Sequence, residues 1–150
     1  ILVLGLAACG EKADEGTADE EVSIPVEEIG TRIFEELEFG SMILLDDETL
    51  MQFYELDPSI LEEYHANIPM MNVTTQEYSV FKVKDAKDAE IVKDAIDKRA
   101  EAVQKSFEQY LPDQYENAKN YYVESEGRYL VFVIHQDVEK AKEIFQSYFN

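Results

Sequence analysis

The chain has 150 residues, 45% of them apolar, and its 13 Lys and Arg against 33 Asp and Glu give a formal net charge of −20 at pH 7. This size and apolar content fit one folded domain with its own core, and a single cysteine excludes a disulfide-stapled scaffold. The acidic excess repels phosphate backbones and anionic lipid head groups, which argues against nucleic-acid binding and against a polybasic membrane patch.

The first ten residues indicate where the protein is located. Residues 1–8 are apolar or glycine throughout, and as a helix they would span only about 12 Å, too little to cross a bilayer. They are typical of the end of a signal peptide. The residues that match a bacterial lipobox are Leu6, Ala7, Ala8, Cys9 and Gly10. We expect Cys9 to carry a lipid that anchors the protein on the extracytoplasmic face of the cell membrane. The alternative is an ordinary secretory signal cut after Ala8, or a chance apolar end.

Residues 9–22 are expected to be a disordered acidic tether that starts at the lipidated Cys9. Residues 10–22 hold six acids, one lysine and almost no apolar surface, so burial cannot offset the entropy of ordering them. A chain of this length reaches about 20 Å, and repulsion between its carboxylates extends it. A calcium site or a partner site is the alternative interpretation of this charge run.

The folded domain is expected over residues 23–150, and it begins with helices. Apolar residues recur at helical spacing between Pro25 and Gly40, which predicts a first helix. A second, short helix is predicted over residues 48–55, with Asp47 as its N-cap and with Leu50 and Phe53 buried.

The middle of the domain predicts a β-hairpin followed by a long helix. Residues 64–70 alternate apolar and polar side chains, and residues 78–84 are rich in β-branched and aromatic residues, so the two segments are predicted to pair as antiparallel strands. Residues 86–110 carry an apolar stripe about six turns long, which predicts an amphipathic helix.

The C-terminal part repeats this order. Residues 121–125 and 129–135 predict a second hairpin, and Asp137 is the expected N-cap of a final helix. The fold class is therefore α+β: a single domain of about four mostly antiparallel strands in two strand-strand-helix units, with additional N-terminal helices. We expect both unit helices on one face of the sheet and the N-terminal helices on the other. Strand 129–135 is apolar on both sides and should be buried on both faces.

Several stretches together resemble one family of bacterial lipoproteins. They are the lipobox, the acidic linker, residues 80–85, the long helix with Lys98, Arg99, Gln104, Phe107 and Tyr110, and the closing strand and helix after Tyr129. This combination is similar to the domain-of-unknown-function family 4358 over residues 24–149. The family comprises predicted lipoproteins of Firmicutes, chiefly clostridia, so the resemblance implies a Gram-positive cell surface. It implies no catalytic or binding residues, because the family has none to transfer.

Arg99 interrupts the apolar stripe of the long helix. At 100° per residue it lies within about 40° of the centre of the stripe, where an unpaired guanidinium would be costly. Two interpretations are open. Arg99 forms a buried ion pair with an acid or a loop carbonyl, or it is a bidentate anchor for the carboxylate of a ligand.

The sequence contains no recognisable catalytic motif. A Gly-x-Ser-x-Gly elbow, a His-Glu-x-x-His helix and a glycine-rich phosphate loop are all absent. His65, on the polar side of a strand, and His135, at the end of another, are candidate bases or metal ligands, although exposed or capping histidines are the simpler interpretation. Carboxylate pairs are uninformative in a chain with 33 acids. We expect no cofactor and no metal site.

These observations favour a non-catalytic binding or interaction module, held at the membrane through Cys9, with an unknown protein or small molecule as partner. The first alternative is an acidic lipoprotein that captures cations or cationic peptides, suggested by the charge of −20. The last alternative is a hydrolase that combines a carboxylate pair with His65 or His135.

Overall fold

The computed structural model describes residues 22–150. The predicted end of the signal peptide, at residues 1–8, and nearly all of the predicted tether, at residues 9–22, lie outside the described residues. So do the lipobox residues Leu6, Ala7, Ala8, Cys9 and Gly10. Within residues 22–150, no helix is both long enough and apolar enough to cross a membrane.

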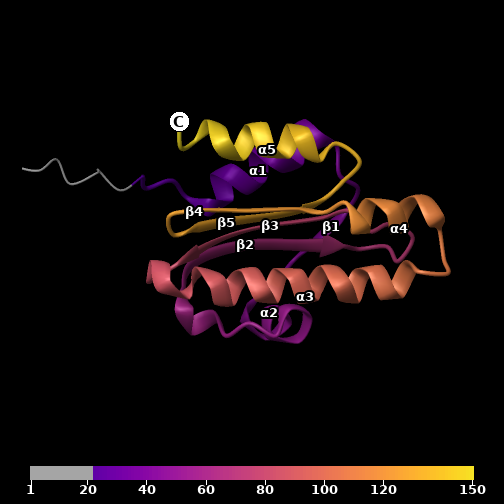
Figure 1. Cartoon of the computed structure of the whole chain (residues 1–150), viewed down its shortest axis with the longest axis horizontal. Coiled ribbons are helices and arrows are strands. Elements are labelled where there is room, and N and C mark those ends of the chain that lie inside the picture. The colour runs from indigo at the N-terminus through magenta and orange to yellow at the C-terminus, as the bar shows by residue number, and fades with distance from the viewer. Residues whose placement is uncertain (1–21) are drawn as a thin grey trace, which may run out of the picture.

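The described residues form a mixed α+β domain (Figure 1). The helices are α1 (Val26–Leu37), α2 (Asp47–Tyr54), α3 (Ala89–Phe107), α4 (Pro112–Lys119) and α5 (Val138–Ser147). The strands are β1 (Met42–Leu44), β2 (Leu61–Pro69), β3 (Glu77–Val83), β4 (Tyr122–Glu126) and β5 (Tyr129–Ile134). Two short 3₁₀ helices, η1 (Pro58–Ile60) and η2 (Ala86–Asp88), precede β2 and α3.

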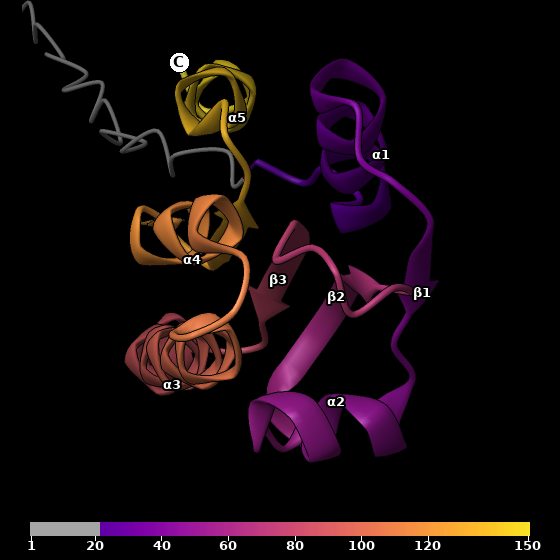
Figure 2. The ribbon, with the colours of Figure 1, turned by 90° about the vertical axis from the view of Figure 1, so that its right-hand side faces the viewer.

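The five strands form one open sheet in the order β1-β2-β3-β5-β4, and every neighbouring pair is antiparallel. Helices cover both faces, as Figure 1 shows: α1 and α5 lie on one face, and α2 and α3 lie on the other. The helix α4 packs against α3 at one end of the sheet (Figure 2). The fold is thus a helix-sheet-helix sandwich built on an antiparallel sheet.

The two cores follow from the alternation of side chains along the central strands. Leu130, Phe132 and Ile134 of β5 pack toward α3, while Val131 and Val133 pack toward α1 and α5. Every residue of β5 is buried, which confirms that this strand is covered on both faces. Such a strand reads as a continuous apolar run, because neither of its sides meets water.

Both predicted hairpins and the helices that follow them are confirmed. The strands β2 and β3 pair antiparallel, as do β4 and β5. The helix α3 covers most of the predicted span, with η2 forming its first turn. Asp137 caps α5, since its Oδ1 accepts a hydrogen bond from the Lys140 backbone nitrogen at 3.4 Å.

The expected number of strands was one too few. The additional strand, β1, has only three residues and pairs with the end of β2, where Met42 lies opposite Pro69. Three residues are too few to show a period of two, so the sequence pattern did not reveal it.

The placement of the helices on the sheet was also wrong. The two unit helices, α3 and α5, lie on opposite faces, because α3 packs on the side of Phe81 and Phe132 whereas α5 packs on the side of Val80 and Val131. The N-terminal helices are divided too, with α1 beside α5 and α2 beside α3. The sequence similarity of the two units therefore does not correspond to a repeated packing arrangement.

Two local assignments need correction. The N-cap of α2 is Asp46, not Asp47: Asp46 Oδ1 accepts from the Thr49 backbone nitrogen at 2.9 Å, and Thr49 Oγ1 accepts from the Asp46 backbone nitrogen at 2.8 Å. This reciprocal pair is a capping box. The second correction is α4, a short helix that begins at Pro112, where the sequence predicted only the end of the long helix.

Candidate functional site

A buried ion pair joins α3 to the first residue of β3. Arg99 donates from Nε to Glu77 Oε2 at 2.9 Å and from Nη2 to Glu77 Oε1 at 2.7 Å. Only 1% of the Glu77 side chain and 14% of the Arg99 side chain are exposed. Two-point, charge-assisted bonding of this kind compensates both groups for leaving water. The ion pair expected from the sequence is therefore present, and a ligand-binding role for Arg99 stays a prediction.

Three more side chains surround the ion pair. The Tyr54 hydroxyl donates to Glu77 Oε2 at 3.1 Å and lies 2.7 Å from Ser79 Oγ. The Phe53 ring centroid lies 5.2 Å from Arg99 Cζ, a cation–π distance. Burial raises the pKa of Tyr54 well above its ordinary value, and the charge of Glu77 adds to the shift. Burial lowers the pKa of Arg99, but the hydrogen bonds and charge of Glu77 outweigh it and the net shift is upward. Tyr54 thus stays neutral and Arg99 stays charged.

An apolar pocket of about 320 Å³ opens beside the ion pair, between α2, the C-terminal half of α3 and the segment that follows β2. Its walls include Phe53, Ile68, Met70, Val103 and Phe107, and Arg99 and Glu77 are among its polar lining groups. Small-molecule sites typically combine such apolar walls with a few convergent polar groups. The pocket is therefore the best candidate binding site among the described residues.

Arg99 lines the pocket, and Glu77 takes only two of its five guanidinium N–H donors. Its Nε and Nη2 atoms are bonded to Glu77, whereas Nη1 makes no hydrogen bond within residues 22–150 and is not among the fully buried polar atoms without a partner. Because Glu77 already neutralises the guanidinium, the pocket favours an uncharged hydrogen-bond acceptor over an anion.

The wall of the pocket formed by residues 70–75 is held by α4. The Thr75 backbone nitrogen donates to Gln114 Oε1 at 3.0 Å, and Thr75 Oγ1 donates to the Gln114 carbonyl at 2.7 Å. Farther from this attachment, Met70 and Met71 remain 58% and 59% exposed. Methionine side chains are flexible and polarizable, so they can adapt to ligands of different shape.

His65 packs under α1 on the opposite face of the sheet from the pocket. An added Cβ at Gly30 of α1 would lie only 2.4 Å from His65 Cδ2, and the His65 and Tyr78 ring centroids are 5.9 Å apart. Burial lowers the pKa of His65, and the charge of Glu27 opposes the shift only in part. The imidazole is thus a packing partner of the α1 backbone.

His135 lies on the same face as His65 and is 3% exposed. Its Nδ1 accepts a hydrogen bond from the Asp137 backbone nitrogen at 3.0 Å, and its ring centroid lies 4.8 Å from that of Phe39. Burial lowers the pKa of His135, opposed in part by the backbone carbonyls of Glu38 and Leu37 at the end of α1. The sheet lies between the two histidines and the Arg99 pocket, so neither histidine lines the pocket.

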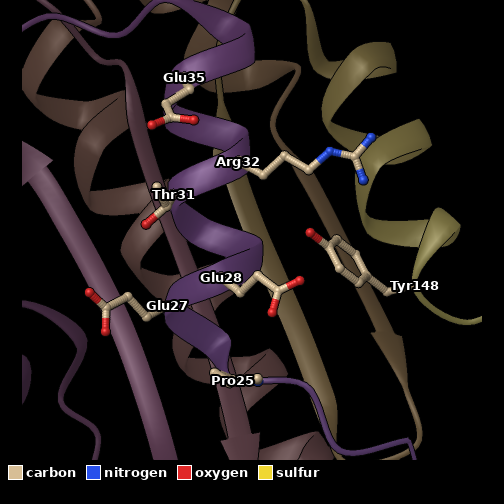
Figure 3. Close-up of a pocket in the computed structure, with 7 residues that line it drawn as sticks. All are labelled: Pro25, Glu27, Glu28, Thr31, Arg32, Glu35 and Tyr148. Atoms are coloured by element: carbon tan, nitrogen blue, oxygen red, sulfur yellow. The ribbon is translucent and has the colours of Figure 1, made fainter.

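A second groove, of about 560 Å³, runs between α1 and the end of α5 (Figure 3). Figure 3 shows the Arg32 side chain extended from α1 toward α5, where Nη1 donates to Ser147 Oγ at 3.1 Å and Cζ lies 5.6 Å from the Tyr148 ring centroid. Nε donates to Glu36 Oε1 at 2.8 Å. The guanidinium is therefore engaged in joining the two helices. Among residues 22–150, no group of three or more His, Cys, Asp or Glu side chains could hold a metal ion.

The sequence identified Arg99 but not the rest of its surroundings. Glu77 was missed as the partner because any of 33 acids could have been chosen, and Tyr54 because the second helix was expected to bury Phe53 instead. One signal was available: Glu77 and Ser79 lie two residues apart before Phe81, on the side of β3 that faces the long helix.

The chain is similar to a known protein family. The family model described as "Domain of unknown function (DUF4358)" matches residues 35–135. No curated protein and no solved structure matches the chain. The matched region includes all five strands, α2, α3 and α4, so the whole of the Arg99 pocket lies within it.

Proposed function

The chain belongs to the DUF4358 family, and we propose that it is a non-catalytic binding module, held on the extracytoplasmic face of a Gram-positive cell membrane by a lipid on Cys9. The observation that carries the binding role is the apolar pocket beside the Arg99–Glu77 ion pair. The lipobox sequence around Cys9 carries the location.

The pocket supports binding because hydrogen bonds hold two of its walls in place. The buried ion pair fixes α3 against β3, and the bonds of Thr75 to Gln114 fix the loop opposite. A pre-formed, apolar recess loses little entropy when it is filled, which is the usual condition for small-molecule affinity.

The lining defines the chemical class of the ligand. Aromatic and aliphatic walls favour an apolar body, and Arg99 Nη1 favours one uncharged acceptor such as an amide carbonyl. An anion is disfavoured twice, by the pairing of Arg99 with Glu77 and by the net charge of −20.

Three six-carbon probes test this class: hexanamide, hexanoate and hexylamine. Their binding to the full chain is measured by changes in the NMR shifts of Ile68, Val103 and Phe107. Hexanamide should perturb these residues with a dissociation constant in the millimolar range, since a ligand of about eight heavy atoms gains little total free energy. Hexanoate and hexylamine should bind more weakly.

A pocket-filling variant provides the control. Ser106 lines the pocket and is exposed, so Ser106→Phe should abolish the hexanamide shifts without loss of stability. Ala102→Phe adds the same ring to an exposed position of α3 that does not line the pocket, and it should leave binding intact. Equal shifts in both variants, or equal affinity for all three probes, would contradict the assignment of this pocket.

The anchor is tested separately, by mass spectrometry of the protein extracted from its native host. A diacylglyceryl group on Cys9, and loss of the protein from the membrane fraction in Cys9→Ser, are the expected results. An amino terminus that retains residues 1–8 without a lipid contradicts the proposed location and leaves the pocket test unaffected.

A further inference from the structure

Among residues 22–150, β1 is an edge strand of the sheet, paired with β2 on one side and with no strand on the other. The Leu45 backbone nitrogen donates to the Ala66 carbonyl at 2.8 Å, and the Met70 nitrogen donates to the Ser41 carbonyl at 3.0 Å. Hydrogen-bonded and non-hydrogen-bonded residue pairs alternate along an antiparallel ladder. The backbone N–H and C=O groups of residues 41, 43 and 45 therefore point toward β2. The N–H and C=O groups of Met42 and Leu44 therefore point outward. Figure 2 shows β1 at the outer side of the sheet, with β2 on its inner side.

Apolar side chains flank this edge. Ile43 is 42% exposed and Leu44 is 61% exposed. Met70 and Met71 are also exposed, and the hydrogen bond of Met70 to Ser41 holds them beside the start of β1. Proteins usually protect an edge strand by keeping it very short, by placing charged residues or prolines on it, or by covering it with another segment. β1 is short, at three residues, but within residues 22–150 it carries no charged residue or proline, and no strand pairs with its outer side.

The charge around the edge has one sign. Residues 33–81, which contain β1, α2, β2 and the first five residues of β3, hold 11 Asp and Glu and no Lys or Arg. Exposed acids lie immediately before and after β1, at Glu38 and at Asp46, Asp47 and Glu48. A segment that reaches this edge enters a strongly negative potential with no basic side chain from these residues to reduce it.

We propose that β1 is a docking site for an extended, cationic segment of a partner protein, which adds to the sheet as a sixth strand. Main-chain bonds to Met42 and Leu44 would provide the pairing, apolar side chains of the segment would contact Ile43 and Leu44, and its basic side chains would meet the flanking acids. A second copy of this chain is disfavoured, because pairing two β1 edges would bring together two bodies of charge −20.

The probe is the amidated, acetylated peptide Lys-Val-Lys-Val-Lys-Val-Lys, with two matched controls. One replaces every lysine by glutamate, and the other carries methyl groups on alternate backbone nitrogens, which keeps the charge but prevents strand pairing. Titration of the full chain should show at least tenfold tighter binding of the probe than of either control. Equal binding of the methylated peptide would reduce the interaction to charge attraction and overturn the proposal, as would no binding of the probe at millimolar concentration.

Two protein variants locate the site. Leu44→Lys places a charge on the edge and should weaken the probe at least tenfold. Ile91→Lys makes the same change on the exposed surface of α3, far from β1 in Figure 2, and should change the affinity less than twofold. Equal effects of the two variants would overturn the assignment.

Hydrogen exchange gives an independent readout. The amides of Met42 and Leu44 should exchange quickly in the free protein and slow at least tenfold with the probe bound, while the Ile43 amide should be protected in both states. No slowing at Met42 and Leu44 would overturn strand addition. Ser106→Phe should leave this peptide binding unchanged, so failure of the pocket and failure of the edge site are distinguishable.

Discussion

Removing the arginine from the buried ion pair should be one of the most destabilising single changes in this domain. In Arg99→Met, the buried Glu77 keeps the hydrogen bond from the Tyr54 hydroxyl but loses the two from Arg99, together with the only opposite charge within bonding distance among residues 22–150. Removing one partner of a buried pair typically costs about 3–5 kcal/mol. For a domain of this size the loss lowers the melting temperature by about 10–15 °C. Urea unfolding and thermal unfolding of the full chain measure it.

The double variant separates the two roles of Arg99. Replacing both partners by apolar groups of similar size, in Arg99→Met with Glu77→Leu, leaves no buried charge and should bring stability within about 1 kcal/mol of the parent. The Tyr54 hydroxyl keeps Ser79 as a partner at 2.7 Å in that variant. Lys93→Met, which removes an exposed pair with Asp97 at 2.9 Å, is the control and should cost no more than about 0.5 kcal/mol.

Two results would refute this reasoning. One is an Arg99→Met variant that is as stable as the Lys93→Met control, and the other is a double variant that is no more stable than Arg99→Met. The stable double variant then also reports on binding, because it retains the apolar walls but lacks the Nη1 donor. Loss of hexanamide binding would assign Arg99 a ligand contact in addition to its structural one. Unchanged binding would limit Arg99 to the ion pair.

Two further predictions concern the histidines. Burial lowers the pKa values of both His135 and His65, so the unfolded state binds more protons than the folded state as the pH falls below about 6.5, and stability should fall there by up to about 1.4 kcal/mol per pH unit for each histidine. His135→Phe should flatten this dependence in urea titrations, and an unchanged slope would contradict it. Gly30→Ala should cost about 1–3 kcal/mol because its Cβ meets His65 at 2.4 Å. In a His65→Ala background, Gly30→Ala should instead stabilise α1, and a double-mutant cycle of thermal unfolding measures the difference. A loss of stability in both backgrounds would argue against a contact between residue 30 and His65.

Periodic patterns made most of the secondary structure predictable. The stripe of α3 and the β-branched run of β3 are long enough for their periods to be unambiguous, and both elements are present. A periodic stripe shows that a helix buries one side, but it does not identify the sheet face that receives it. Because β5 is apolar on both sides, the sequence was compatible with α5 on either face. The resulting error concerned the face on which α5 packs, whereas α3 and α5 themselves were predicted correctly.

The candidate site was predictable only at Arg99, for a comparable reason. A cation in an apolar stripe is a local conflict that the sequence displays directly. The partner that removes this conflict is Glu77, which lies 22 residues away in sequence. One wall of the adjacent pocket is held by the short helix α4, which the sequence did not predict. The edge site was even harder to predict from the sequence. The three residues of β1 form a strand by pairing with β2, and they show no pattern of their own.

The distribution of charge along the chain connects the proposed anchor to the proposed docking site at β1. Residues 33–81 contribute −11 to the net charge, whereas residues 82–150, with 11 basic and 14 acidic residues, contribute only −3. In Figure 2 the strongly acidic part, with β1, β2 and α2, lies on one side of the molecule, and α3, α4 and α5 lie on the other. An anionic membrane surface repels the first side more strongly than the second. A domain anchored through Cys9 would therefore be oriented with the edge of β1 away from the bilayer, where a partner segment can reach it.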